Sequence, residues 1–140
     1  MAINECIFCR IIRREVPAEV LYEDDHVLAI LDINPIHFGH ALVVPKTHCP
    51  DFLSLPPGCY SSVLTAAHRV TQALVSALHV EGYNLFSNNG RIAGQSVFHF
   101  HLHVTPRYPD DNIRFVLQLK SYADGELAST AQLIRDHLHH

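Results

Sequence analysis

Three histidines alternate with apolar residues late in the chain. His99, His101 and His103 stand at every second position of the run 99–105, with Phe100, Leu102 and Val104 in the gaps and Thr105 at its end. Successive side chains of a strand point to opposite faces, so in a strand over 99–105 the three imidazoles would share one face. An imidazole titrates near neutral pH and can bind metal, move protons or attack an electrophile. We therefore expect this face to be the working surface.

Two kinds of chemistry suit three imidazoles on one face. They could bind a catalytic metal, as sets of histidines do in zinc hydrolases. Alternatively, one neutral imidazole could be a nucleophile, with its neighbours orienting it and donating hydrogen bonds to an anion. A protein that binds a ligand without turnover is the third hypothesis, and the residues of the run alone leave all three open.

The loop that precedes the run carries groups suited to phosphate oxygens. Segment 88–96 contains two glycines, the amides of Asn88 and Gln95, and the hydroxyl of Ser96. Glycine permits a close approach of the backbone to a ligand, and neutral amides and hydroxyls donate hydrogen bonds to anions. This loop favours the nucleophile hypothesis over the metal hypothesis.

Two cysteines near the N-terminus have the spacing of a metal or redox site. Cys6 and Cys9 form a Cys-x-x-Cys pair, which alone does not distinguish zinc from redox chemistry. His48 and His99 are candidate third and fourth ligands, and a pair of reduced thiols without metal is the alternative. Cys49 and Cys59 are assigned no role.

The remaining pattern predicts an α+β fold with an antiparallel sheet of about five strands. The sheet would pack against one long and one short helix, and a further helix would lie at the C-terminus. Expected helices cover 6–14, 58–79 and 124–138, and expected strands cover 20–23, 26–32, 41–44, 83–87 and 99–105, with an outer strand over 113–117. Asp32 stands where a buried strand ends, as a turn residue or a ligand contact.

Composition limits the class of protein. The 140 residues carry a net charge of −4, which gives no general attraction to nucleic acid or an anionic membrane. The sequence shows neither a signal peptide nor a membrane-spanning run, and four cysteines are too few for a disulfide scaffold. We expect one cytoplasmic domain over 1–140. His137, His139 and His140 could belong to a tag and are given no function.

The motifs together resemble a known family. The run 99–105 resembles the histidine triad signature, in which three histidines alternate with apolar residues. Segments 88–90, 93–97, 39–46 and 6–9, together with Pro17 and Glu23-Asp24, also look like histidine triad (HIT) nucleotide-binding proteins. The resemblance covers about residues 5–108 and is nearest the bacterial-type, Hint-like branch, whereas 109–140 matches less distinctly.

The resemblance implies a homodimer of α+β subunits that binds purine nucleotides. Family members hydrolyse nucleoside phosphoramidates, acyl-adenylates or dinucleoside polyphosphates, without a cofactor in the reaction. By this likeness His101 is the nucleophile that attacks the α-phosphorus and forms a nucleotidyl-histidine, which water then hydrolyses. A neutral imidazole is suited to this role, because it turns one hard displacement into two easier ones.

The same resemblance assigns roles to the residues around His101. His103 and Ser96 assist catalysis, Ser96 by protonating the leaving group, and His99 orients its neighbours if it binds no metal. Contacts to the nucleotide fall on Asp32 at the ribose hydroxyls, on Ile33, Asn88, Gln95, Ser96 and His40, and on Phe8, Ile11 and Ile30 around the base. Relatives of the bacterial type also imply a structural zinc held by Cys6, Cys9, His48 and His99.

Overall fold

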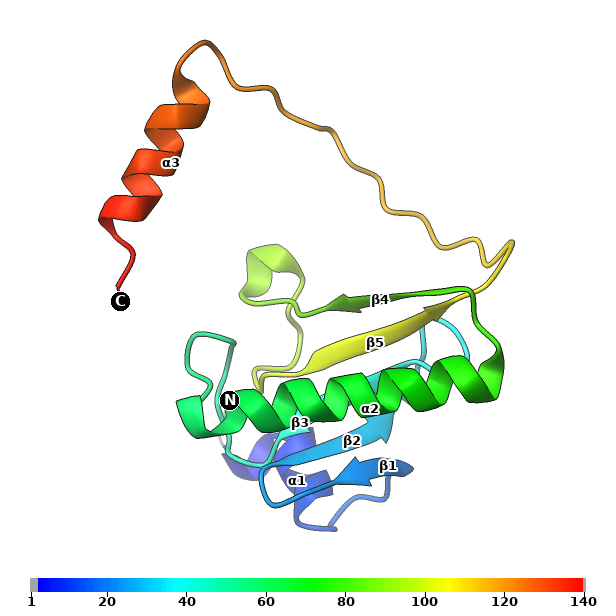
Figure 1. The fold of residues 1–140 in the computed structure, drawn as a ribbon. Helices are drawn as coiled ribbons and strands as arrows, with labels where there is room; N and C mark the ends of the chain where they lie inside the picture. The colour runs from blue at the N-terminus through cyan, green and yellow to red at the C-terminus, as the bar shows by residue number, and fades with distance from the viewer. Residues whose placement is uncertain (1–2, 140) are drawn as a thin grey trace.

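The fold is built on one five-stranded sheet. The computed structural model describes residues 3–139; Met1, Ala2 and His140 lie outside it. In spatial order the strands are β1 (Val20–Glu23), β2 (Val27–Leu31), β3 (Ala41–Pro45), β5 (Leu102–Arg107) and β4 (Gly82–Phe86), and each pairs antiparallel with its neighbours. This confirms the predicted α+β class, and Figure 1 shows the strands in this order.

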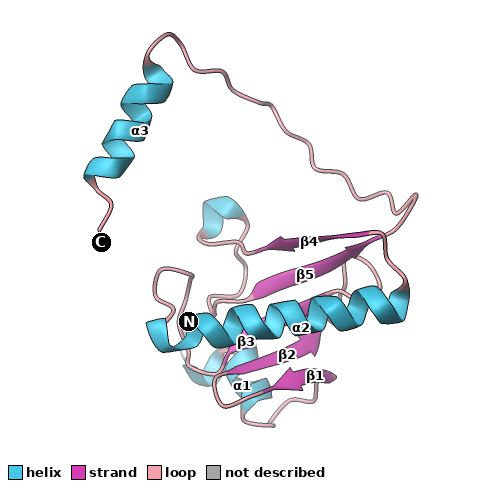
Figure 2. Cartoon of the chain, viewed as in Figure 1, coloured by secondary structure: helices cyan, strands magenta, loops and turns pink. Residues whose placement is uncertain are grey.

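A long helix covers one face of the sheet. Helix α2 (Tyr60–Leu78) lies across β2, β3 and β5 (Figure 2). Its apolar stripe, which includes Val63, Val70 and Leu74, packs on the side chains of Val43 and Val104 in one buried cluster. The expected helix over 58–79 is confirmed, except that Pro57–Cys59 forms a separate 3-10 turn before it.

A short helix covers the opposite face. Helix α1 (Ile7–Ile12) buries Phe8, Cys9 and Ile11 in a second cluster that also contains Leu28 and Ile30 of β2. The alternation along β2 explains the continuous apolar run of that strand, because its other residues face α2. The site is built on this α1 side of the sheet.

The strand that carries the histidines starts later than predicted. Pairing begins at Leu102, opposite Val43, and continues through Arg107, opposite Gly82, whereas we expected the run to end at Thr105. The N–H of Phe100 donates instead to the carbonyl of Cys49, at 2.7 Å, so His99 to His101 lie in an irregular segment before the strand. The alternation still holds there, because Phe100 is buried in the α2 cluster.

The C-terminal part departs most from expectation. The outer strand predicted over 113–117 is wrong, since 113–123 has no regular secondary structure. The last helix is confirmed as α3 (Glu126–Asp136), but it buries none of its residues and stands apart from the sheet (Figure 1). We call residues 113–123 the C-terminal arm. Among residues 3–139, no helix is both long enough and apolar enough to span a membrane.

Candidate active site

A backbone carbonyl fixes the orientation of His101. Its Nδ1 lies 2.8 Å from the carbonyl oxygen of His99. A carbonyl can only accept a hydrogen bond, so Nδ1 carries the proton and the Nε2 lone pair is left free. The ring is held from one side by Phe8, with centroids 5.0 Å apart, and lies beside His103 at 4.8 Å. The geometry therefore leaves Nε2 of His101 unprotonated and oriented.

A second chain of hydrogen bonds fixes His103. The N–H of Ile36 donates to Nδ1 of His40 at 3.0 Å, so the proton of the neutral His40 ring is on Nε2. That Nε2 lies 2.9 Å from Nδ1 of His103 and donates to it. The neutral His103 ring must then carry its own proton on Nε2, where it can donate to a ligand. The His40 ring, buried at the start of β3, thus sets the tautomer of His103.

Two features that the sequence did not point to support these rings. Phe86 of β4 stacks on His103 with centroids 4.4 Å apart and planes 9° apart, because the two residues are partners in the sheet register. Gly39 has φ +93, and a Cβ there would lie 2.5 Å from Cδ1 of Leu78, so only glycine lets this loop approach the end of α2. The stacking of Phe86 depends on strand register, which leaves no local pattern in the sequence. Gly39 is visible in the sequence as a glycine, but what it packs against is not.

The carboxylate of Asp32 lies near the imidazoles of His40, His101 and His103. An oxygen of Asp32 lies 3.8 Å from Nδ1 of His40, and its other oxygen accepts the N–H of Asn34 at 2.9 Å. The charge of Asp32 opposes the effect of burial on the pKa values of His40, His101 and His103. Asp32 therefore forms the turn hydrogen bond that one interpretation expected, and it also lies within the electrostatic range of the histidines. Its contact with a ligand stays a prediction.

Burial keeps the imidazoles neutral. Desolvation lowers the pKa of His40 and of His101, and it lowers the pKa of His99 and of His103 to about 4. The desolvated site disfavours the charged form of each ring because the surroundings solvate a cation poorly. At neutral pH all four rings are uncharged, which is the form that a nucleophile needs.

This burial makes the protein less stable in mild acid. Burial lowers the pKa of His103 to about 4 in the folded protein, against about 6.5 for a histidine in water, so between these values the unfolded chain binds more protons. The free energy of unfolding should fall as pH drops from 7 to 5, by about 2 kcal/mol from His103 alone. Urea denaturation across this range measures it, and His103→Gln should show a smaller fall. An equal fall in the variant would mean that His103 is not the source of this pH dependence.

The loop before the histidines is held together by Gln95. Its amide oxygen accepts the N–H of Gly90 at 2.8 Å, and its nitrogen donates to the carbonyls of Pro50 and Val97 at 2.6 and 3.1 Å. Gln95 thus shapes the loop, and its predicted contact to phosphate stays a prediction. Asn88 is half-buried beside this loop, and Ser96 is exposed, so both are free for a ligand.

The residues expected around the base divide into two groups. Phe8, Ile11 and Ile30 are all buried in the α1 cluster, so core packing accounts for them. Ile33 is 86 % exposed, just beyond Asp32. Their role in holding a base stays a prediction.

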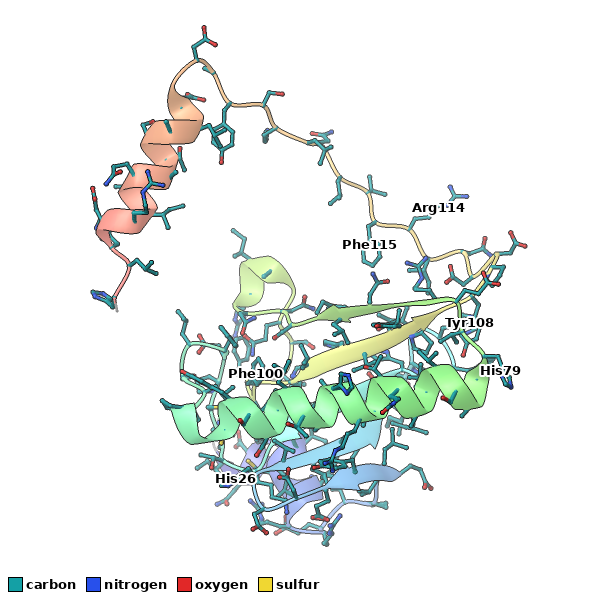
Figure 3. The ribbon with its side chains drawn as sticks, viewed as in Figure 1. His26, His79, Phe100, Tyr108, Arg114 and Phe115 are labelled. Atoms are coloured by element: carbon teal, nitrogen blue, oxygen red, sulfur yellow. The ribbon has the colours of Figure 1, made fainter. Side chains whose placement is uncertain are left out.

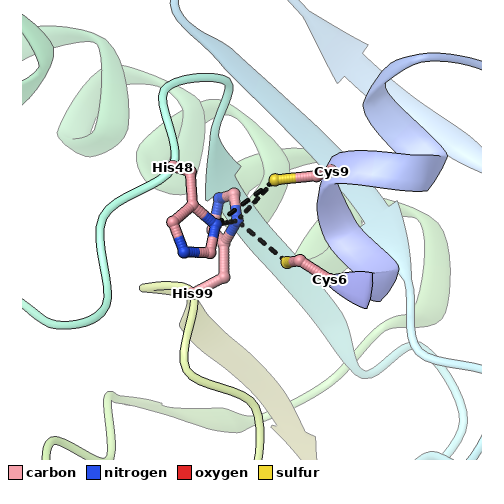
Figure 4. A group of neighbouring side chains, drawn as sticks. All are labelled: Cys6, Cys9, His48 and His99. Carbon is pink, nitrogen blue, oxygen red and sulfur yellow. Dashed lines mark hydrogen bonds between the residues drawn. The ribbon is translucent and has the colours of Figure 1, made fainter. Parts of the chain in front are cut away.

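Four side chains converge between α1 and the start of the histidine segment. The sulfurs of Cys6 and Cys9 lie 3.3 and 3.5 Å from Nδ1 of His99, and Nδ1 of His48 lies 3.1 Å from the same atom. The four ligand atoms all lie within 4.8 Å of one another (Figure 4). Within residues 3–139, this is the place where cysteine and histidine ligands gather, and His99 is the one triad histidine in it.

The donor set fits a tetrahedral metal ion. Nε2 of His99 donates to the carbonyl of Pro45 at 2.8 Å, so its Nδ1 lone pair points at the sulfurs. Zinc bonds of about 2.0 Å to nitrogen and about 2.3 Å to sulfur require ligand separations close to these. Burial, together with the neighbouring Cys6, raises the pKa of Cys9 to about 11, so metal binding would release a proton there. A closed set of this kind suits a structural ion.

Comparison with known proteins decides the family. The HIT domain model matches residues 13–110, which include both the β-sheet and the three histidines. The chain belongs to the HIT family. The resemblance stated from the motifs is thereby confirmed, although Cys6 and Cys9 precede the matched region.

Three relatives of this HIT protein are informative. The Arabidopsis thaliana protein named adenylylsulfatase HINT3 is 38 % identical over 138 residues, which are 96 % of this chain and 70 % of the relative. The crystal structure of a HIT-family member from Bacillus subtilis superposes with a TM-score of 0.92 and 35 % identity, covering 97 % of this chain and 99 % of that one. A zinc-bound histidine triad protein from Mycobacterium smegmatis superposes with a TM-score of 0.75 and 37 % identity, covering 96 % and 99 %.

Proposed function

We propose that this protein hydrolyses or transfers nucleotides by cleaving the bond between the α-phosphorus and its leaving group. The substrates we propose are purine nucleoside phosphoramidates and related adenylylated or dinucleotide compounds. One observation carries the proposal: the carbonyl of His99 holds Nδ1–H of His101 and leaves its Nε2 lone pair free. The Arabidopsis relative, named an adenylylsulfatase, supports an adenylyl group on the substrate.

The proposed reaction has two displacements at phosphorus. Nε2 of His101 attacks and forms a P–N bond, while the bond to the leaving group breaks and Ser96 supplies a proton to that group. The ring then carries positive charge, which the His99 carbonyl and Asp32 stabilise. Water attacks the phosphorus next and returns one proton to Ser96, the P–N bond breaks, and His101 returns neutral. Nε2–H of His103 donates to a phosphate oxygen in both steps.

We further propose a structural zinc at Cys6, Cys9, His48 and His99. The converging ligand atoms support it, and so does the zinc-bound relative from Mycobacterium smegmatis. The ion would tie α1 to the histidine segment and take no part in bond breaking. We also propose a cytoplasmic homodimer as the working form. None of the four cysteines forms a disulfide, as expected in a reducing compartment, and the homodimer is what the resemblance to the HIT family implies.

Trapping the intermediate tests the proposed function. The protein is mixed briefly with an adenosine phosphoramidate, quenched, and weighed intact by mass spectrometry, with and without a chelator. We expect an adenylyl adduct in both arms. Turnover that a chelator abolishes, with no adduct, would instead favour the three histidines as metal ligands. Binding without adduct or turnover, across a panel that includes adenylyl sulfate, would leave a nucleotide-binding protein.

The contact of Asp32 with ribose gives a separate prediction. Asp32→Asn should lower kcat/KM for a ribonucleotide substrate on the order of tenfold to a hundredfold, because a charged acceptor of the ribose hydroxyls is lost. With a 2′,3′-dideoxy substrate the variant should lose clearly less, because only the stabilisation of the His101 charge is then removed. Equal losses for both substrates would mean that Asp32 acts on the histidines rather than on ribose.

A further inference from the structure

An apolar groove runs along the side of α2 that faces β1. It lies between the helix and the strands β1 and β2 (Figure 1) and has a volume of about 410 Å³. The helix lines it with a stripe at helical spacing that consists of Arg69, Val70, Ala73, Leu74, Ala77 and Leu78. Clefts of this volume with a mostly apolar lining are typical binding sites for small molecules. The groove therefore has room for a ligand on the face of the sheet opposite the histidines.

The two ends of the groove differ in chemistry. At the C-terminal end of α2, Leu78 lies against the backbone of Gly39, where a Cβ would lie only 2.5 Å from Cδ1 of Leu78. Arg69 and Tyr22 stand at the other end, with the guanidinium carbon 5.7 Å from the centre of the tyrosine ring. From Arg69 to Leu78 the helix rises about 14 Å. A ligand that fills the groove is therefore long and narrow, with an apolar end at Leu78 and a polar end at Arg69.

Arg69 is the charged residue of the lining, and it has no carboxylate partner. Within residues 3–139 it takes part in no ion pair, whereas Arg10, Arg13, Arg14 and Arg107 all pair with acidic side chains. The described residues that line the groove include no aspartate or glutamate. A guanidinium can bind a carboxylate through two parallel hydrogen bonds. The end of the groove at Arg69 thus suits an anionic head group.

The surroundings of Arg69 favour a head group with a single negative charge. The hydroxyl of Tyr22 donates to Oδ2 of Asp24 at 3.2 Å, so a carboxylate lies just beyond the ring on which Arg69 stands. One arginine balances one negative charge, and a second charge on the head group would be repelled by Asp24. The groove therefore matches a single carboxylate followed by an unbranched apolar chain better than it matches a phosphate ester.

We propose that this groove binds a free fatty acid of medium chain length, with the carboxylate on Arg69 and the alkyl chain along α2 toward Leu78. The chain covers apolar surface that is otherwise in contact with water, since Leu21 is 47 % and Leu78 is 42 % exposed. Burial of this surface drives binding, and the ion pair with Arg69 fixes the direction of the ligand. This site does not depend on the proposed chemistry of His101.

Calorimetric titration with dodecanoate, kept below the concentration at which it forms micelles, tests the chemistry of the ligand. We expect saturable binding of one dodecanoate per chain. Dodecan-1-ol, which lacks the charge, and acetate, which lacks the chain, should each bind at least tenfold more weakly, because each lacks one of the two contributions. The proposal is overturned if dodecanoate does not bind saturably, or if the alcohol or dodecyl phosphate binds as tightly as dodecanoate.

Matched variants and amide signals test the place of binding. Arg69→Gln and Ala73→Leu should each weaken dodecanoate binding at least tenfold, because the first removes the cation and the second fills the groove. The controls Arg114→Gln, on the C-terminal arm, and Ser76→Leu, on α2 outside the groove, should bind as the unaltered chain does. Titration of ¹⁵N-labelled protein should move the amide signals of Ala73 and Gly39. Full binding by either groove variant, or shifts confined to other parts of the chain, would overturn this site.

Discussion

His101→Ala is expected to lower kcat for an adenosine phosphoramidate about a thousandfold or more and to abolish the covalent adduct. The substitution removes the Nε2 lone pair that the His99 carbonyl orients. The ring of His137 also has its Nδ1 against a carbonyl, that of Leu133, but it is exposed at the end of α3 and is not part of the triad. Steady-state kinetics gives the loss in kcat, and intact mass after a quench gives the adduct. The residual rate would come from the remaining donors around the phosphate.

The matched control for this variant is His26→Ala. His26 is exposed on the turn between β1 and β2 (Figure 3), and its side chain makes no hydrogen bond to the triad histidines, so its removal should leave kcat unchanged. Because His101 is buried, its alanine variant must also keep its circular dichroism spectrum and cooperative unfolding. A folded His101→Ala protein with more than a tenth of the original kcat would exclude His101 as the nucleophile.

The sequence predicted the sheet and the long helix well, because their signals are local. Continuous apolar runs mark β2 and β3, and the stripe Val63, Val70 and Leu74 marks α2. The alternation of histidines and apolar residues placed His101 and His103 on one side even though pairing starts only at Leu102. The side chains of 99–103 thus alternate between the two faces even though 99–101 precede the paired strand.

What the sequence could not predict depends on contacts between distant segments. His99 illustrates this, because its ring points toward Cys6 and Cys9 while its carbonyl holds His101. A pattern of residue types carries no information about which backbone oxygen a side chain will meet. The stacking of Phe86 on His103 likewise follows from strand register, which the spacing within one strand does not determine.

The strand predicted over 113–117 is wrong for a related reason. The apolar residues of 113–117 predict an outer strand, since apolar side chains usually pack against their own domain. Here the ion pair between Arg107 and Asp111, with the hydrogen bond from Arg107 to the carbonyl of Ile113, holds the chain in a turn after β5. The residues that follow do not pair with β4. A pattern of apolar residues does not by itself distinguish a strand that pairs with the sheet from an irregular segment that leaves it.

Removing the proposed metal is expected to have the second largest effect. It should lower the stability of the protein and also weaken the support of the His101 ring. Cys9→Ser should lower the metal content from about one ion per chain to near zero and lower the melting temperature by about 10 °C or more. Helix α1 would lose its tie to His99. Phe8, which lies between the two cysteines in sequence, packs at 5.7 Å from His99 and 5.0 Å from His101, so both rings lose support.

Metal analysis, melting curves and the ring ¹⁵N shifts of His101 together separate the possible causes. Arg10→Ser, on the exposed side of the same helix, should keep the metal and the melting temperature. In Cys9→Ser the His101 shifts should move toward a mixture of tautomers, because the His99 carbonyl that selects Nδ1–H is no longer held. A metal-free protein that melts as before would contradict a structural ion. A destabilised protein with unchanged His101 shifts would mean that the His99 backbone is held by Pro45 and Cys49 alone, since these carbonyls accept the His99 ring N–H and the Phe100 N–H.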